Sequence, residues 1–226
     1  MLVAKKSVWF EKIFAVYNIN LIKRRFNSLQ VSGLDFLTAR DKNIPLLIYA
    51  NHSSWWDGLV AFQISRTVKL DSFLMMEEKQ LRKLRLFRKI GAFSVVREKP
   101  REAIKSIAYA ADILRKKPNR AVWIFPQGEI LPSDKRPLCF YNGLSKIIKK
   151  VGGKIQLLPI AIRYEFSGNY KPEIFIKIGK VESIIPDENF DAKKFTQELS
   201  LNLTRLVDQL KLEIISQDFI KFKNLT

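Results

Sequence analysis

The chain has 226 residues, of which 47% are hydrophobic, with a single cysteine, a single histidine and a formal net charge of +18. This length gives one ordinary domain with a sizeable core, or a domain with a helical extension. One cysteine excludes an internal disulfide framework and a multi-cysteine zinc site, and with only one histidine beside it we expect no metal site at all. The charge predicts a polyanionic partner, either nucleic acid or an anionic membrane surface.

The N-terminal residues 1–30 carry apolar and aromatic side chains at roughly helical spacing, closed by a basic cluster. The apolar run is broken by polar residues, is too short to span a bilayer, and is followed by no signal-peptide cleavage site. We therefore predict an amphipathic helix that associates with the membrane interface, and the alternative is a helix packed on the domain's own core. The side chains predicted to contact lipid are Trp9, Phe10 and Phe14, and the basic cluster is Lys23, Arg24 and Arg25.

From residue 31 to residue 226, apolar runs typical of strands alternate with segments of helical spacing. This alternation predicts an α/β domain with a single mixed or mostly parallel sheet flanked by helices. The predicted strands are Leu46–Ala50, Asp71–Met76, Ala92–Val96, Ala121–Phe125 and Gln156–Ile162, with Ile174–Gly179 as an edge strand. The predicted helices are a basic one at Gln80–Ile90, one from Pro100 to Pro118, Asn142–Val151, and a long amphipathic one from Asp191.

The stretch from Asn51 to Asp57 follows the first predicted strand and contains His52, the only histidine. A neutral imidazole can take a proton from a hydroxyl, and a nearby carboxylate fixes its tautomer. Positions five apart diverge by about 140° on a continuous helix. For the two side chains to meet, His52 must lie on a strand-to-helix turn and Asp57 in the first helical turn. The alternative is structural, because Ser54-x-x-Asp57 also fits a capping box for a helix beginning near Trp55.

Four segments lie at the ends of apolar strands, where function gathers in α/β sheets. In this order and at this spacing they resemble the conserved blocks of the glycerolipid acyltransferase superfamily, the family of 1-acylglycerol-3-phosphate acyltransferases. Its first block is Asn-His-x4-Asp, and its second is a Gly-led apolar strand that ends in arginine. Its third is Phe-Pro-Glu-Gly-Thr-Arg, and its fourth is an apolar strand with a proline. The matching segments are Asn51–Asp57, Gly91–Arg97, Phe125–Ile130 and Leu157–Ala161.

The resemblance implies an enzyme that transfers a fatty acyl group from a thioester, on coenzyme A or acyl carrier protein, to a hydroxyl of a lipid acceptor. It implies no cofactor beyond this donor substrate. His52 is then the general base and Asp57 its orienting partner. No Gly-x-Ser-x-Gly elbow is present, so we expect transfer without a covalent enzyme intermediate. The residues that the resemblance implies in acceptor or donor binding are Asn51, Arg97, Pro126, Gln127, Gly128 and Pro159.

Two positions depart from the third block, since Gln127 replaces its glutamate and Ile130 its arginine. In the family, residues of the second and third blocks hold the acceptor's phosphate, so Arg97 lacks its usual companion. Lys135 and Arg136 follow closely and either substitute for it or form a solvated basic turn. Lysophosphatidic acid is the first expectation for the acceptor. A non-phosphorylated lipid or glycolipid, or a catalytically silent membrane-binding relative, is the alternative.

A nucleic-acid-binding protein is the competing class, because the basic segment Lys79–Lys89 would suit phosphate contacts. No RNA-recognition, zinc-finger or helix-turn-helix pattern supports it. We therefore expect an anionic membrane surface and no nucleic acid among the partners. The predicted location is peripheral or monotopic, on the cytoplasmic face of a bacterial cell membrane.

Overall fold

The computed structural model describes residues 1–226 and contains nine strands and eight helices, one of them a 3-10 helix. The strands are β1 Leu29–Ser32, β2 Leu46–Ala50, β3 Asp71–Glu77, β4 Ala92–Val95, β5 Arg120–Ile124, β6 Ile155–Glu165, β7 Glu173–Ile178, β8 Glu182–Ile184 and β9 Lys223–Asn224. The helices are α1 Val8–Arg25, α2 Leu34–Thr38, α3 Asp57–Thr67, α4 Glu78–Lys83, the 3-10 helix η1 Arg85–Ile90, α5 Pro100–Lys116, α6 Gly143–Val151 and α7 Ala192–Ile215.

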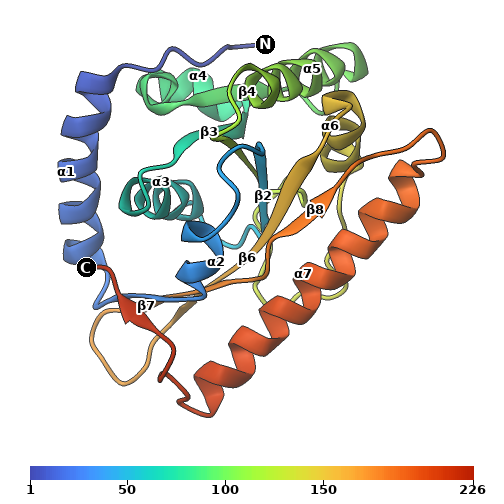
Figure 1. Ribbon diagram of the computed structural model, residues 1–226. Coiled ribbons are helices and arrows are strands. Elements are labelled where there is room, and N and C mark those ends of the chain that lie inside the picture. Colours follow the sequence, from blue (N-terminus) through green and yellow to red (C-terminus); the bar gives the residue numbers. More distant parts are fainter.

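All nine strands belong to one sheet in the order β4-β3-β5-β2-β6-β7-β1-β9, with β8 paired to β6 (Figure 1). The first five strands of this order run parallel to one another. β7 lies antiparallel to β6 and parallel to β1. The predicted α/β class and the single mixed sheet are therefore confirmed. The predicted edge position of Ile174–Gly179 is wrong, because the short strand β1 pairs with the outer side of β7.

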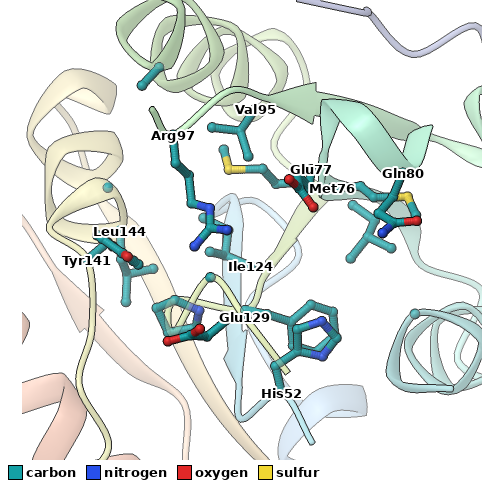
Figure 2. Close-up of a pocket in the computed structure, with 18 of the residues that line it drawn as sticks. His52, Met76, Glu77, Gln80, Val95, Arg97, Ile124, Glu129, Tyr141 and Leu144 are labelled. Carbon is teal, nitrogen blue, oxygen red and sulfur yellow. The ribbon is translucent and has the colours of Figure 1, made fainter. Parts of the chain in front are cut away.

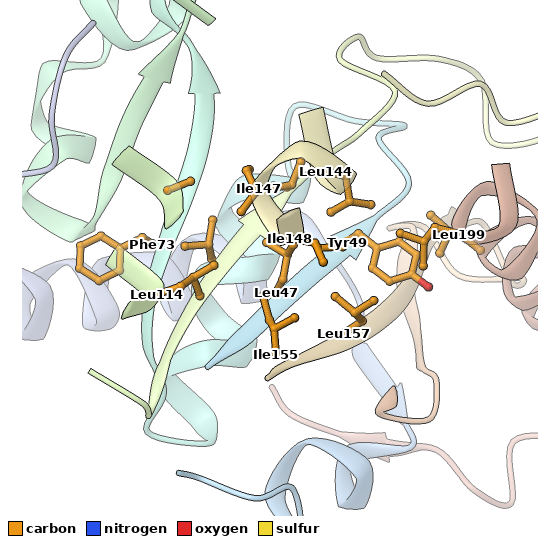
Figure 3. Packing of buried hydrophobic residues seen from close by; sticks show 14 of the residues in the cluster. Leu47, Tyr49, Phe73, Leu114, Leu144, Ile147, Ile148, Ile155, Leu157 and Leu199 are labelled. Carbon is orange, nitrogen blue, oxygen red and sulfur yellow. The ribbon is translucent and has the colours of Figure 1, made fainter. Parts of the chain in front are cut away.

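Helices cover both faces of the sheet, and the alternation along β2 shows how the two layers form. Leu47 and Tyr49 point into a cluster shared with α5, α6 and α7, which Figure 3 shows in close-up. Leu46 and Ile48 point to the other face, into a cluster shared with α3 and the end of α1. All five residues of β2 are buried, as expected for a central parallel strand with helices on both faces. The strand that leads to His52 is therefore held rigidly.

The basic segment predicted as one helix is divided at Leu84 into α4 and η1. The 3-10 helix ends at Gly91, whose φ of +104° lets the chain turn into β4. No helix in the structure has the length and apolar content needed to cross a membrane.

The first helix, α1, packs one apolar face on α3 and η1 and leaves a second apolar face exposed. Phe14 is only 8% exposed and contacts the rings of Phe62 and Phe87. The prediction that Phe14 contacts lipid is therefore wrong, because this side chain belongs to the protein's own core. Phe10 is half-buried and stacks on Phe14, whereas Trp9 is 71% exposed. The helix thus has apolar residues on two faces and lacks the polar face of the predicted amphipathic helix.

Candidate active site

His52 and Asp57 lie on the turn between β2 and α3, at the carboxyl end of the central parallel strand. The Nδ1 atom of His52 is 2.7 Å from Oδ2 of Asp57, and the Asp57 side chain is fully buried. The same oxygen accepts hydrogen bonds from the backbone N–H groups of Ser53 and Ser54, at 2.8 and 3.0 Å. One carboxylate therefore meets both alternatives of the sequence pattern, because it caps the turn before α3 and also orients the imidazole. The helix begins at Asp57, two residues after Trp55, near which the pattern predicted its start.

The His52 ring is held so that its second nitrogen is free. The ring stacks on Phe125, with centroids 4.6 Å apart and planes at 20°. Because Nδ1 faces a carboxylate, it carries the proton, and Nε2 is left with its lone pair. The His52 side chain is 22% exposed and lines a cavity. This arrangement suits a general base that accepts a proton at Nε2.

The backbone around His52 is fixed by two side chains that the sequence placed among the substrate-binding residues. Oε1 of Gln127 accepts a hydrogen bond from the backbone N–H of His52 at 2.8 Å. The amide of Asn51 bonds both the carbonyl and the N–H of Ile162 in β6, at 2.9 and 2.8 Å. Both side chains are buried and neither lines the cavity. In the structure these side chains hold the His52 turn in place, and their part in substrate binding stays a prediction.

A cavity of about 620 Å³ opens beside His52 and extends between the ends of the parallel strands (Figure 2). Fourteen of its 25 lining residues are hydrophobic, so the cavity offers an apolar path with a few polar groups. Of the predicted residues, His52, Arg97, Pro126 and Gly128 line it. The apolar wall includes Leu74, Met75, Met76, Phe87, Val95, Ile107, Ile124 and Leu144, and the charged lining residues are Glu77, Arg97, Glu129 and Lys146.

Arg97 extends into the cavity and makes no hydrogen bond or ion pair with the protein (Figure 2). Its guanidinium carbon lies 5.5 Å from the centre of the Tyr141 ring. Gly128, with a φ of +73°, makes this approach possible. A Cβ atom there would lie 2.5 Å from Nη1 of Arg97 and 2.9 Å from the Tyr141 ring. The glycine of the third block thus shapes the site by leaving room for an unpaired cation.

Three other predicted residues lie away from the cavity. Arg136 turns towards α7, where it forms an ion pair with Asp208. Lys135 does not line the cavity either. Pro159 lies within β6, and its carbonyl accepts a hydrogen bond from the backbone N–H of Gly179. The predicted binding roles of these three residues therefore stay predictions that the geometry of this cavity does not support.

Comparison with known protein families identifies the family to which the chain belongs. The family model described as Acyltransferase matches residues 28–163, more than half of the chain. The chain belongs to the acyltransferase family. The match lies within the glycerolipid acyltransferase superfamily, whose general reaction is acyl transfer to a lipid acceptor. Among curated proteins, none matches the chain.

Two residues of this acyltransferase site were not identified from the sequence. Lys146 on α6 is a cation that lines the cavity and belongs to none of the four motif blocks. Tyr164 donates a hydrogen bond from its hydroxyl to Oδ1 of Asp57, at 2.6 Å. Burial raises the pKa of Tyr164 well above its ordinary value, and the charge of Asp57 adds to the rise. The strand predicted at Gln156–Ile162 ended too early, because β6 continues to Glu165 and therefore includes Tyr164.

Proposed function

We propose that this acyltransferase moves a fatty acyl group from a thioester donor, acyl-CoA or acyl carrier protein, to a hydroxyl of a lysophospholipid-type acceptor. The observation that carries the proposal is the buried Asp57 carboxylate bonded to Nδ1 of His52, at the wall of a largely apolar cavity. His52 is the general base in this proposal, and Asp57 orients it and stabilises the imidazolium.

The reaction needs only proton transfers through His52. The acceptor hydroxyl gives its proton to Nε2 while its oxygen attacks the thioester carbonyl carbon. The tetrahedral intermediate then collapses, the carbon–sulfur bond breaks, and the imidazolium returns the proton to the departing thiolate. The thioester is already an activated acyl donor, so making a nucleophile from an alcohol is the demanding step, and the His52–Asp57 pair supplies it.

The apolar part of the cavity suits the donor's acyl chain. Met75 and Met76 on β3, Val95 on β4 and Ile107 on α5 are among the apolar residues that line it. Burial of a methylene group contributes about 0.8 kcal/mol, so a fatty acyl chain placed here gains binding energy along its length. This energy is available for positioning the thioester carbonyl beside the base.

The acceptor's phosphate is proposed to bind Arg97, whose planar guanidinium suits bidentate contact and has no protein partner. Lys146 lines the same cavity and offers a second cation in place of the missing arginine. A non-phosphorylated lipid or glycolipid is the second candidate. The observation that favours it is Ile130, which lines the cavity with an apolar side chain at the position of that arginine.

Attachment to an anionic membrane surface is part of the proposal, since the acceptor is a lipid. The exposed face of α1 carries five large apolar side chains: Val8, Trp9, Ile13, Val16 and Tyr17. The 3-10 helix η1 packs against α1 and is joined to α4, and these two helices carry the basic residues Lys79, Arg82, Lys83, Arg85, Arg88 and Lys89. Apolar burial and attraction to anionic lipid act together in such a surface. The cytoplasmic leaflet supplies that charge.

The test is a panel of acceptors offered with labelled acyl-CoA or acyl carrier protein. The panel contains lysophosphatidic acid, a zwitterionic lysophospholipid and a neutral monoacylglycerol, and it compares the protein with Arg97→Lys. We expect transfer to the phosphorylated acceptors, weakened by Arg97→Lys because lysine lacks the planar fork, with transfer to monoacylglycerol unchanged. Transfer to neutral acceptors alone would overturn the phosphate role of Arg97. No transfer to any lipid hydroxyl would overturn the proposed function.

A further inference from the structure

The Asp57 carboxylate is the most completely hydrogen-bonded side chain of the site. Three donors share its Oδ2 atom: the Ser53 and Ser54 backbone N–H groups and Nδ1 of His52. Its Oδ1 atom has one partner, the Tyr164 hydroxyl at 2.6 Å. Tyr164 lies one residue beyond the stretch that matches the family, which ends at residue 163. It comes from β6, 107 residues away from Asp57 along the chain.

We propose that Tyr164 is a positioning residue of the acyl-transfer reaction, which extends the His52–Asp57 pair to a hydrogen-bonded chain of three. Its hydroxyl fixes the orientation of the carboxylate and stabilises the negative charge that remains on the pair when His52 is neutral. The proposal rests on the proposed role of His52 as general base.

The burial of Asp57 makes this hydrogen bond necessary. The carboxylate is fully buried, and a buried charged oxygen without a donor is strongly disfavoured. Without the Tyr164 hydroxyl, Oδ1 would have no partner in the structure. The carboxylate would then rotate or take up a proton, and either change would weaken its bond to His52.

The surroundings of Tyr164 hold it firmly enough to act in this way. Its ring packs against Phe26, with centroids 5.7 Å apart, and its backbone pairs with Ile174 of β7. Two residues earlier, both backbone groups of Ile162 bond the side chain of Asn51. The end of β6 thus fixes the catalytic turn at two points, one before His52 and one after it.

Tyr164 and His52 are the two ionisable side chains that bond Asp57. Its raised pKa keeps the hydroxyl protonated, and so a donor, wherever the enzyme is assayed. Of the two neighbours of Tyr164 on β6, Arg163 forms ion pairs with the other neighbour, Glu165, and with Asp134. The charged groups that share the cavity with His52 are Glu77, Arg97, Glu129 and Lys146, and none of them bonds Asp57.

The test is the variant Tyr164→Phe, which keeps the packed ring and removes only the hydroxyl. The hydrogen bond stabilises the pair when it carries a net negative charge, which is the state that accepts the acceptor's proton. Its removal therefore favours the protonated pair, and the acidic limb of kcat/KM should move to higher pH by about one unit. We also expect kcat to fall ~10- to 100-fold, as befits the loss of a hydrogen bond to a charged group.

The matched control is Tyr49→Phe. Tyr49 is a buried tyrosine on β2 whose hydroxyl makes no hydrogen bond in the structure. This variant should keep the activity and the pH profile of the wild type. Suppose that His52→Ala is inactive while Tyr164→Phe keeps the rate of the wild type and the same acidic limb of its pH profile. The proposal for Tyr164 is then overturned, and the proposed function stands. A slower Tyr164→Phe enzyme with an unmoved limb also overturns it, because that result indicates packing alone.

A second measurement uses the fact that His52 is the only histidine. In a sample labelled at the histidine ring and the tyrosine ζ carbon, one imidazole signal reports the titration of the pair. We expect its midpoint to be higher in Tyr164→Phe than in the wild type. Should that variant not fold, the wild-type protein alone tests the proposal. The chemical shift of the Tyr164 ζ carbon must then change with pH at the same midpoint as that of the His52 ring. Two different midpoints would overturn the proposal.

Discussion

Gly128 shows how one residue without a side chain sets the position of two others. Its φ of +73° is one that residues with a side chain rarely adopt, and a Cβ atom at this position would lie only 2.5 Å from Nη1 of Arg97. In Gly128→Ala, we expect the KM for a phosphorylated acceptor to rise and the free energy of unfolding to fall by about 1 to 3 kcal/mol. Steady-state kinetics and urea unfolding measure the two effects.

The control for this variant is Gly153→Ala, because Gly153 has no neighbour near a Cβ position and no left-handed φ. It should change neither quantity. A Gly128→Ala protein with the acceptor KM of the wild type would show that Arg97 is not positioned by this contact.

At this scale the sequence predicts only the parts of the site that lie close together in the chain. His52 and Asp57 are five residues apart, and one strand-to-helix turn is enough to bring them together. Tyr164 reaches Asp57 from 107 residues away, and that contact depends on the register between β2 and β6. Gln127 and Asn51 were found as motif residues, but their roles required the hydrogen bonds to His52 and Ile162.

At the scale of elements, α1 has a packed face and an exposed face that respond differently to substitution. Phe14 packs on Phe62 and Phe87, whereas Val16 is 62% exposed. We expect Phe14→Ala to lower the free energy of unfolding by about 3 kcal/mol or more, because it leaves a cavity between α1 and α3. Val16→Ala on the other face should change it by less than ~0.5 kcal/mol. Equal effects in denaturant unfolding would contradict the packing of α1 described here.

The loop after the third block is tied to β6 and α7 through Asp134. Arg163 and Lys211 both contact Oδ1 of Asp134 at 3.0 Å. The Arg163 guanidinium, with help from Lys211, holds the pKa of Asp134 well below its ordinary value of 3.8. A carboxyl with a lowered pKa in the folded state stabilises the fold above its unfolded pKa, and this contribution is lost as the pH falls towards the folded value.

Asp134→Asn should therefore melt below the wild type at pH 7 and approach it below about pH 4. Because the Asp134 side chain is 55% exposed, we expect a difference of only ~1 kcal/mol or less at pH 7. Asp187→Asn is the control, since Asp187 is exposed and forms no ion pair. A gap that stays constant between pH 7 and pH 3 would show that the ion pairs do not stabilise the loop.

The elements that the sequence predicts best are the long buried strands and the capped helices. β2 has the predicted bounds, and α7 begins just after Asp191, whose side chain accepts hydrogen bonds from Lys193 and Lys194. The four-residue strand β1 was missed because it is too short to show a period. Its place beside β7 is set by tertiary pairing alone, and so the edge of the sheet was misplaced.

For the whole molecule, α1 carries an exposed apolar face and packs against η1, which together with α4 carries a run of basic residues. Figure 1 shows α7 on the opposite side of the molecule from α1. Combined replacement of Trp9, Ile13 and Val16 by serine should leave a protein that binds anionic liposomes only at low salt. Salt screens the attraction between the basic residues and the anionic lipid, which is all that the variant retains. The wild type also buries apolar side chains in the membrane, and salt does not weaken that contribution to binding.

The control is the combined replacement of Leu201, Leu212 and Ile215, three exposed apolar residues of α7, by serine. It should sediment with liposomes as the wild type does at every salt concentration. If the α1 variant also does so at high salt, the exposed face of α1 is not the membrane-binding surface.

The most direct test of the account is the rate of acyl transfer by His52→Ala, compared with the wild type on the acceptor that the wild type uses best. Circular dichroism and the melting temperature first establish that the variant is folded. Because no other imidazole exists in the chain, we expect kcat to fall by ~10²- to 10⁴-fold, the usual contribution of general-base catalysis. A folded His52→Ala protein that transfers the acyl group at nearly the wild-type rate would contradict the assignment of His52 as the base.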